Sequence, residues 1–207
     1  LSLPPSERQE FSHFDVNTQS KFYMAINDAV DVLSFTQKVM SAFADVEEQR
    51  MLQKGDFLLR EGEVETQLYL IEEGAVKLAY PGEDDEKIIR LAYNGSVINS
   101  LSSYLNGQTS EFYIETIRQT KVKSLAKEAI MQIVFENQQS LQQYTQFLET
   151  LLIQQTEREL DLLTDSPAKR LERVLRRSPD LFQFVPLKYI AAYLRMKPET
   201  LSRIRNS

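Results

Sequence analysis

Three side chains near the end of the chain could make hydrogen bonds to the edges of DNA bases. Glu199, Ser202 and Arg203 follow Pro198, a residue that favours the first position of a helix, and their spacing places them on one side of that helix. A glutamate accepts a hydrogen bond from the amine of cytosine, and an arginine donates two to guanine. The chemistry predicted for this helix is the reading of a DNA sequence. An ordinary solvent-facing helix surface carries the same residue types, so the spacing alone does not decide.

The residues around this helix fit a helix-turn-helix over residues 185–205. Small or branched apolar residues occupy the positions where the two short helices must pack together: Ile190, Ala191, Leu194, Leu201 and Ile204. The remaining positions face outward. The residues expected to contact DNA are Lys188, Arg195, Lys197, Glu199, Thr200, Ser202 and Arg203.

The positive charge of the chain is concentrated in the same region. The whole chain has a net charge of −6, but residues 164–207 contain ten basic and four acidic residues, which leaves −12 for residues 1–163. A basic module attached to an acidic body is typical of a protein in which one part binds a polyanion and the rest has another task.

The cysteine and histidine content excludes most catalytic and metal chemistry. The chain has no cysteine and a single histidine, His13. It therefore has no thiolate zinc site, no iron–sulfur cluster, no cysteine nucleophile and no metal cluster of the kind that a cupin enzyme needs. We expect no haem, because His13 in the N-terminal leader is the one histidine that could be an axial ligand. The sequence predicts a binding protein and not an enzyme.

Short segments of strand-forming residues, separated by glycines, make up the middle of the chain. All six glycines lie between positions 55 and 107. Short strands with glycine turns are typical of a β-roll or a sandwich. The expected strands are Asp56–Leu59, Gln67–Ile71, Ala75–Tyr80, Lys87–Tyr93, Phe112–Ile117 and Lys121–Leu125.

Helices are expected on both sides of these strands. Asp28–Ala44 has apolar residues at helical spacing and contains no glycine or proline, and residues 127–164 also lack both. A helix of about 25 residues in the second segment would be about 37 Å long, which is longer than the roll can cover, so we expect its C-terminal half to self-associate. The apolar seam expected at the dimer interface consists of Leu141, Tyr144, Leu148, Leu151 and Leu152.

The N-terminal residues do not read as a secretion signal or a membrane anchor. Leu1–Glu10 contains prolines and charges but no continuous apolar stretch, and the apolar runs elsewhere span only a handful of positions. We expect a cytoplasmic protein with no membrane partner.

The chain resembles the Crp/Fnr family of bacterial transcription regulators in the order of its parts and in three motifs. These are the glycine-containing segments Lys54–Gly62 and Leu68–Leu78 and the motif Glu199-x-x-Ser202-Arg203. The resemblance extends over about residues 45–207. In the Fnr branch the Glu, Ser and Arg of this motif read the bases, and the resemblance assigns that role to the three matching residues here.

The resemblance implies an α+β fold in three parts. Residues 1–130 would form an N-terminal helical segment and a β-roll of the cyclic-nucleotide-binding type, which is the sensor domain. Residues 131–163 would form a long dimerisation helix, and residues 164–207 a winged helix-turn-helix that looks truncated at Ser207.

The segment 99–111 departs from the cyclic-AMP binders of this family. Those proteins use a glutamate for the ribose hydroxyl and an arginine next to a serine for the cyclic phosphate, and the matching positions here are Ser100, Ser110 and Glu111. A carboxylate at the phosphate position repels a cyclic phosphate, and no arginine lies between Leu91 and Ile117 to replace the missing one. We therefore expect an effector pocket at these residues that does not bind cyclic AMP in the usual mode. The effector itself is left unidentified.

The turn of the helix-turn-helix is a second departure. Its usual residue in the family is glycine, because the turn requires a positive φ, and Arg195 occupies that position. Keeping the conformation with a side chain present costs about 1 kcal/mol.

Two functions are open at this point. The first is a homodimeric DNA-binding transcription regulator that recognises a palindromic operator and has RNA polymerase as a further partner. The alternative is a small-molecule-sensing β-roll module that acts through protein partners without specific DNA binding. The basic C-terminal segment favours the first.

Overall fold

The computed structural model describes residues 30–83 and 85–206. The leader with His13, and the expected helix start at Asp28, lie outside these residues. The strands are β1 (Arg50–Leu52), β2 (Phe57–Leu59), β3 (Gln67–Glu73), β4 (Ala75–Tyr80), β5 (Lys87–Tyr93), β6 (Val97–Ile98), β7 (Tyr113–Thr116) and β8 (Thr120–Ala126). The helices are α2 (Val30–Ala44), α3 (Leu101–Asn106), α4 (Lys127–Val134), α5 (Gln138–Leu163), α6 (Pro167–Arg177), α7 (Leu181–Phe184), α8 (Leu187–Tyr193) and α9 (Pro198–Arg205).

The strands form a β-roll of two antiparallel sheets, with strand orders β1-β8-β3-β6 and β2-β7-β4-β5. Apolar residues from both sheets fill the space between them, among them Ile71, Val76, Leu78, Ile114 and Val122, each at most 4% exposed. The short segments of strand-forming residues that predicted the strands therefore supply this core.

The turn between β3 and β4 accepts only glycine. Gly74 has φ 98°, and a Cβ atom at this position would lie 2.4 Å from the carbonyl oxygen of Gln119. The two sheets approach each other closely here because no side chain separates the turn from the segment that leads into β8.

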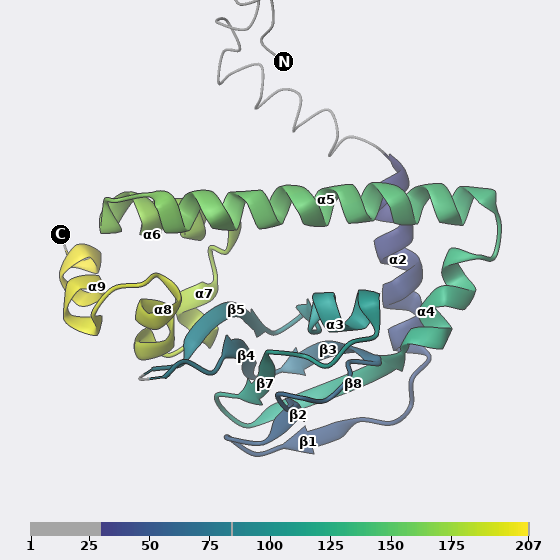
Figure 1. The fold of residues 1–207 in the computed structure, drawn as a ribbon, viewed down its shortest axis with the longest axis horizontal. Helices are drawn as coiled ribbons and strands as arrows, with labels where there is room; N and C mark the ends of the chain where they lie inside the picture. Colours follow the sequence, from purple (N-terminus) through teal and green to yellow (C-terminus); the bar gives the residue numbers. More distant parts are fainter. Residues whose placement is uncertain (1–29, 84, 207) are drawn as a thin grey trace, which may run out of the picture.

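A second core joins the roll to the helices around it. Phe35 of α2 is 1% exposed, and its ring centroid lies 5.3 Å from those of Tyr144 and Phe147 on α5. α2 also contacts β8 and α4. In Figure 1, α5 runs along the length of the molecule, with α2 and α4 beneath one end and the C-terminal helices beneath the other. The N-terminal half of α5 therefore packs mainly on α2, whereas the sequence predicted that it would pack on the roll.

A third core is shared between the roll and the C-terminal helices. Ala75 and Ile117 of the roll are buried together with Leu171, Leu181 and other residues of α6 to α9. The rings of Tyr93 on β5 and Phe184 on α7 stack with centroids 5.3 Å apart. α8 contacts β5 directly, as Figure 1 also shows. The C-terminal helices are thus docked on the roll as well as connected to α5.

The observed elements match most of the predicted ones. β4 and β5 have the predicted bounds, and α2 ends at the predicted residue. The single helix expected over 131–163 is two helices, because Asn137 begins α5 by accepting a hydrogen bond from the amide of Ser140 at 2.9 Å. β1, β6, α3 and α7 were not predicted. Among the described helices, none has the length and apolar character needed to cross a lipid bilayer.

Candidate functional site

The helix pair α8 and α9 has the inner face that the sequence predicted. Ile190 and Ala191 of the first helix, Leu194 directly after it and Leu201 of the second helix are completely buried, and Ile204 is half-buried. The two helices pack directly on each other. The segment has the short helix, turn and second helix of a helix-turn-helix.

The turn between these helices has the strained conformation expected from the sequence. Arg195 has φ 54°, and no other non-glycine residue of the described chain has a positive φ. The amide of Met196 donates to the carbonyl oxygen of Ala191 at 3.0 Å, which closes the end of α8. Burial lowers the pKa of the Arg195 guanidinium, so its charge lies partly out of water at this turn.

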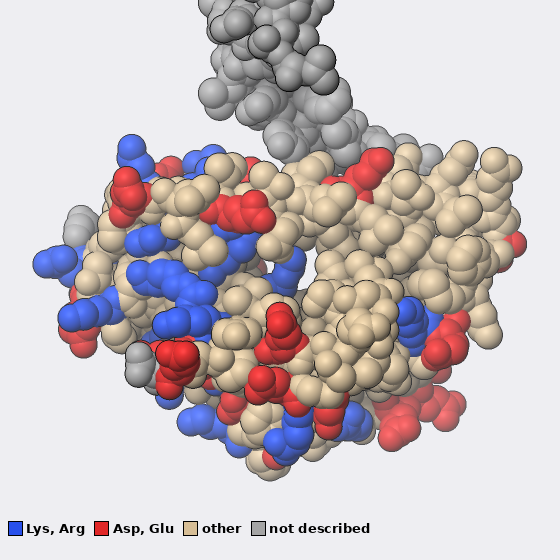
Figure 2. Space-filling model, viewed as in Figure 1, with Lys and Arg blue, Asp and Glu red and all other residues tan. Residues whose placement is uncertain are grey.

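The outward face of α9 presents the predicted residues at different depths. Glu199 and Arg203 are exposed, whereas Thr200 and Ser202 are half-buried. Lys197 precedes the helix, and Lys188 of α8 lies with its Nζ 4.6 Å from the ring centroid of Tyr189; both are exposed. Figure 2 shows Lys and Arg side chains gathered over the end of the molecule that holds α6 to α9.

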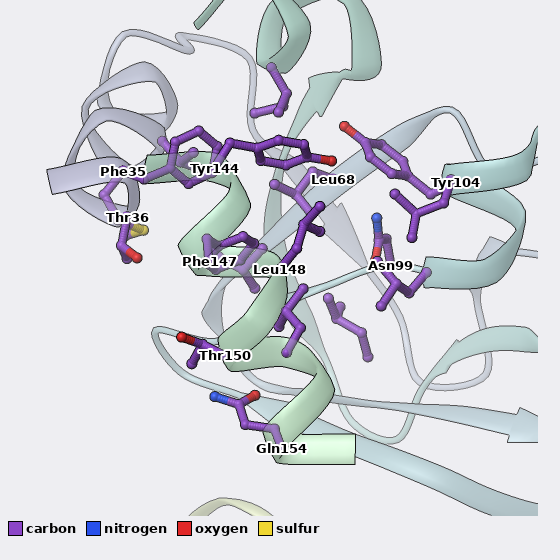
Figure 3. Close-up of a pocket in the computed structure, with 18 of the residues that line it drawn as sticks. Phe35, Thr36, Leu68, Asn99, Tyr104, Tyr144, Phe147, Leu148, Thr150 and Gln154 are labelled. Atoms are coloured by element: carbon purple, nitrogen blue, oxygen red, sulfur yellow. The ribbon is translucent and has the colours of Figure 1, made fainter. Parts of the chain in front are cut away.

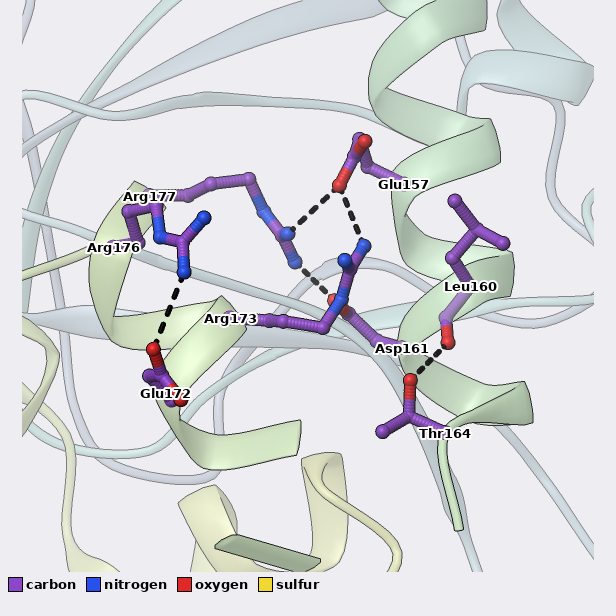
Figure 4. A network of polar contacts seen from close by, with 8 residues as sticks. All are labelled: Glu157, Leu160, Asp161, Thr164, Glu172, Arg173, Arg176 and Arg177. Carbon is purple, nitrogen blue, oxygen red and sulfur yellow. Dashed lines mark hydrogen bonds and ion pairs between the residues drawn. The ribbon is translucent and has the colours of Figure 1, made fainter. Parts of the chain in front are cut away.

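Some of these basic side chains form ion pairs within the chain. The carboxylate of Asp161, at the end of α5, is fully buried and accepts hydrogen bonds from Arg173, at 2.8 Å, and from Arg177. Glu157 accepts from the same two arginines, at 2.7 and 3.3 Å (Figure 4). Hydrogen bonding to Asp161 raises the pKa of Arg173. These two arginines therefore hold α6 to α5 and are not available to a polyanion.

This network was not predicted from the sequence. The pattern that could have predicted it is a matched spacing on two neighbouring helices. Glu157 and Asp161 are one helical turn apart on one helix, and Arg173 and Arg177 are one turn apart on the next.

A second cluster of charges joins the β4–β5 hairpin to α8. The Lys77 side chain is 7% exposed and pairs with Glu86 and, at 3.0 Å, with Glu115, while Tyr113 donates its hydroxyl to Glu86. Burial acts to lower the pKa of Lys77, but hydrogen bonds to the two carboxylates outweigh it and the pKa is raised. Lys77 Nζ also lies 5.6 Å from the ring centroid of Tyr189 on α8.

The predicted effector pocket brings two of its three residues together. Ser100 and Ser110 are buried, with 2.8 Å between their hydroxyl oxygens, and the Ser110 hydroxyl donates to the carbonyl oxygen of Phe112 at 2.8 Å. Glu111 is exposed. The two serines therefore satisfy each other's hydrogen bonds.

A carboxylate that the sequence analysis missed lies beside these serines. Glu65 is 2% exposed and accepts hydrogen bonds from the amides of Gln67, at 2.9 Å, and Ser100, at 3.4 Å. Burial raises the pKa of this carboxyl, and the two amides partly offset that effect. A buried acid close to Ser100 is the wrong electrostatic environment for a phosphate.

The predicted dimer seam is divided between two faces of α5. Tyr144 packs against Phe35, and Leu148 and Leu151 are half-buried against the chain itself. Leu141 and Leu152 are 42% and 69% exposed. Leu160, Leu162 and Leu163 are also exposed, and Leu160 and Leu163 were not predicted to belong to the seam. Leu141, Leu152 and Leu163 are spaced 11 residues apart, a repeat that keeps them on one face of a helix. This spacing could have predicted the exposed face of α5.

Comparison with known proteins identifies the fold. The family model for the cyclic nucleotide-binding domain matches residues 49–137. A search among curated proteins finds no match.

Several solved structures resemble most of the chain. FixK2 from Bradyrhizobium japonicum is 18% identical, with 78% of this chain and 83% of that chain covered and a TM-score of 0.65. The c-di-GMP responsive global regulator CLP from Xanthomonas campestris is 17% identical, with coverage of 83% and 90% and a TM-score of 0.55. TTHB099 from Thermus thermophilus, a transcriptional regulator of the CRP family, is 18% identical, with coverage of 76% and 82% and a TM-score of 0.54. Residues 49–137 thus match the cyclic nucleotide-binding domain, and the chain has the fold of the Crp/Fnr-type transcription regulators.

Proposed function

We propose that this chain is a DNA-binding transcription regulator that acts as a homodimer in the cytoplasm and responds to an effector other than a cyclic nucleotide. The observation that carries the proposal is the helix pair α8 and α9, closed by the left-handed Arg195 and presenting Glu199, Ser202 and Arg203 outward. The fold shared with known regulators supports it.

The position of these residues on α9 favours base contacts. Recognition helices touch base edges mainly with their N-terminal residues, and Glu199 is the second residue of α9. Arg203 lies one turn further along the same face and is placed to donate two hydrogen bonds to a guanine. Lys188, Arg195 and Lys197 flank this face and would contact phosphates, which position the helix without reading sequence.

A homodimer follows from the outward face of α5. Leu152 and Leu163 are 69% and 76% exposed on a helix that otherwise packs on its own chain, and a second copy of the same helix would cover them. Two recognition helices related by a two-fold axis would meet successive major grooves. The operator would then be an inverted repeat with half-sites about 34 Å apart. RNA polymerase is the further partner that a regulator of this type requires.

The effector domain would not bind a cyclic nucleotide in the usual way. Ser100 and Ser110 bond each other, and the buried Glu65 accepts from the amide of Ser100. The segment 99–111 contains no lysine or arginine that could neutralise a phosphate. Calorimetry with cyclic AMP and cyclic GMP should show no saturable binding at micromolar ligand.

Selection of bound sequences from random duplex DNA tests the main proposal. We expect a palindromic consensus from the wild-type protein, and loss of preference at one position of each half-site for Arg203→Ala. Arg176→Ala is the matched control, because Arg176 is exposed on α6 and pairs only with Glu172 among the described residues. If no sequence is enriched, the protein acts through other partners and the proposal fails.

A further inference from the structure

A cavity of about 400 Å³ lies between the roll, α2 and α5. Its walls are mainly apolar and include Phe35 of α2, Leu68 of β3, and Phe147 and Leu148 of α5. Figure 3 shows these side chains surrounding one space, with Asn99 and Tyr104 on the opposite side from α5. The volume falls within the range of pockets that hold small organic molecules.

Two buried polar atoms in this wall have no hydrogen-bond partner among the described residues. They are the side-chain nitrogen of Asn99 and the hydroxyl of Tyr104, which is only 5% exposed as a residue. Buried donors in folded proteins are nearly always paired. Burial raises the pKa of Tyr104 to about 12, so its hydroxyl keeps its proton and can donate. Both groups offer a hydrogen to whatever occupies the cavity.

The charges around the cavity limit what it can hold. Among the described residues that line it, Arg90 is the one charged residue, and its guanidinium donates to Gln155 at 3.3 Å near the surface. The described lining residues include no acidic side chain. The apolar walls favour an apolar molecule over water, which needs several polar partners to be held.

We propose that this cavity binds a neutral, mostly apolar organic molecule that carries a carbonyl or similar acceptor, bonded by Asn99 and Tyr104. This site is distinct from the pocket at Ser100 and Ser110, where the two hydroxyls already bond each other. Its walls include α2, which lies outside the segment that matches the cyclic nucleotide-binding domain.

The occupant would touch the helix that supports the DNA-binding module. Tyr144, Phe147, Leu148 and Leu151 line the cavity, and further along the same helix Asp161 holds the arginines of α6. The bound molecule would therefore be the effector, a step that rests on the proposed function, whereas the binding itself does not.

A neutral fluorescent ketone, 6-propionyl-2-dimethylaminonaphthalene, tests the binding site. We expect saturable binding of one dye per chain with a blue shift of its emission. Tyr104→Phe and Asn99→Leu should each weaken binding about three- to tenfold, since each removes one hydrogen bond. The related dye 2-dimethylaminonaphthalene lacks the ketone and should be insensitive to both changes. Tyr80→Phe is the matched control, because Tyr80 is 43% exposed on β4 and does not line the cavity.

A variant that fills the cavity gives an independent test of where the dyes bind. Leu101→Trp adds a large ring to the lining and should abolish binding of both dyes. Absence of saturable binding to the wild type, or wild-type affinity for the ketone in both donor variants, would overturn the site. Unchanged operator affinity in the presence of saturating dye would overturn the effector role alone.

Discussion

The guanidinium of Arg158 on α5 lies over the ring of Tyr193, the last residue of α8, with its Cζ 3.7 Å from the ring centroid. The same guanidinium donates to the carbonyl oxygen of Tyr193 at 2.7 Å. That carbonyl belongs to the last turn of a helix, where no amide of the helix itself can bond it. α5 thereby caps the first helix of the DNA-binding pair with a cation, a favourable charge at this end of a helix.

Removal of this cap should loosen the C-terminal helices. We expect Arg158→Met to lower the free energy of unfolding by about 1–3 kcal/mol, because the variant has neither the charged hydrogen bond nor the stacking on Tyr193. Urea unfolding followed by circular dichroism measures it. Arg176→Ala, which removes an exposed pair one turn apart on α6, should change stability little. Equal stability of both variants would contradict the capping role.

The turn residue Arg195 combines backbone strain with a predicted phosphate contact, and two substitutions separate them. Arg195→Gly relieves the positive φ and should stabilise the protein by up to about 1 kcal/mol, whereas Arg195→Ala keeps the strain and should not. Both remove the charge, so both should weaken binding to specific and random duplexes alike. A difference in DNA affinity between the two variants would show that the turn conformation, and not the charge, governs binding.

Base reading and phosphate contact should differ in their response to sequence and salt. Arg203→Ala should cost about 1–3 kcal/mol on the selected operator and relax one base preference per half-site. Lys188→Ala should weaken all duplexes alike and reduce the salt slope by about one unit for each phosphate that is no longer neutralised. Fluorescence anisotropy at several salt concentrations measures both. Equal weakening of specific and random duplexes by Arg203→Ala would make Arg203 a phosphate contact.

The dimer should depend on the outward face of α5. Because Leu152 is 69% exposed within its own chain, Leu152→Glu should leave the fold intact and shift the protein to monomers, as measured by sedimentation equilibrium. Phe135→Ser is the control: Phe135 is 70% exposed but lies between α4 and α5. Leu148 is unsuitable for this test because it lines the cavity. A dimer that survives Leu152→Glu would place the interface elsewhere.

The cluster around Lys77 should make stability sensitive to acid. Burial acts to raise the pKa of Glu86, but hydrogen bonds from Lys77 and Tyr113 outweigh it and the pKa lies below its ordinary value of 4.5. The stabilisation from this group is therefore present above pH 4.5 and is lost as the pH falls through the lowered pKa.

Glu86→Gln should accordingly be less stable than the wild type at neutral pH and should lose less stability on acidification. Urea midpoints measured from about pH 7 to about pH 3 give the two curves. Glu83→Gln, at an exposed position of the same hairpin, should follow the wild-type curve. Parallel curves for Glu86→Gln and the wild type would mean that this carboxylate does not contribute to the acid response.

Local patterns predicted the parts of the fold that local chemistry determines. β4 and β5 were predictable because they are short segments of strand-forming residues between glycines, and the conformation of Arg195 followed from its place in the helix-turn-helix. Neither the burial of Glu65 nor the lack of a partner for the Tyr104 hydroxyl among the described residues could be predicted, since both depend on which segments meet across the roll. The two-helix form of residues 127–163 was missed because the cap at Asn137 requires no glycine or proline.

The exposed leucines of α5 also bear on how the cell would set the activity of this protein. If the operator is bound only by paired chains, then below the dissociation constant of the pair a twofold rise in copy number gives about a fourfold rise in the binding species. Gene dosage and proteolysis would then act on transcription as steeply as any effector does. The patch of Leu141, Leu152 and Leu163 would make the abundance of the regulator a signal in its own right.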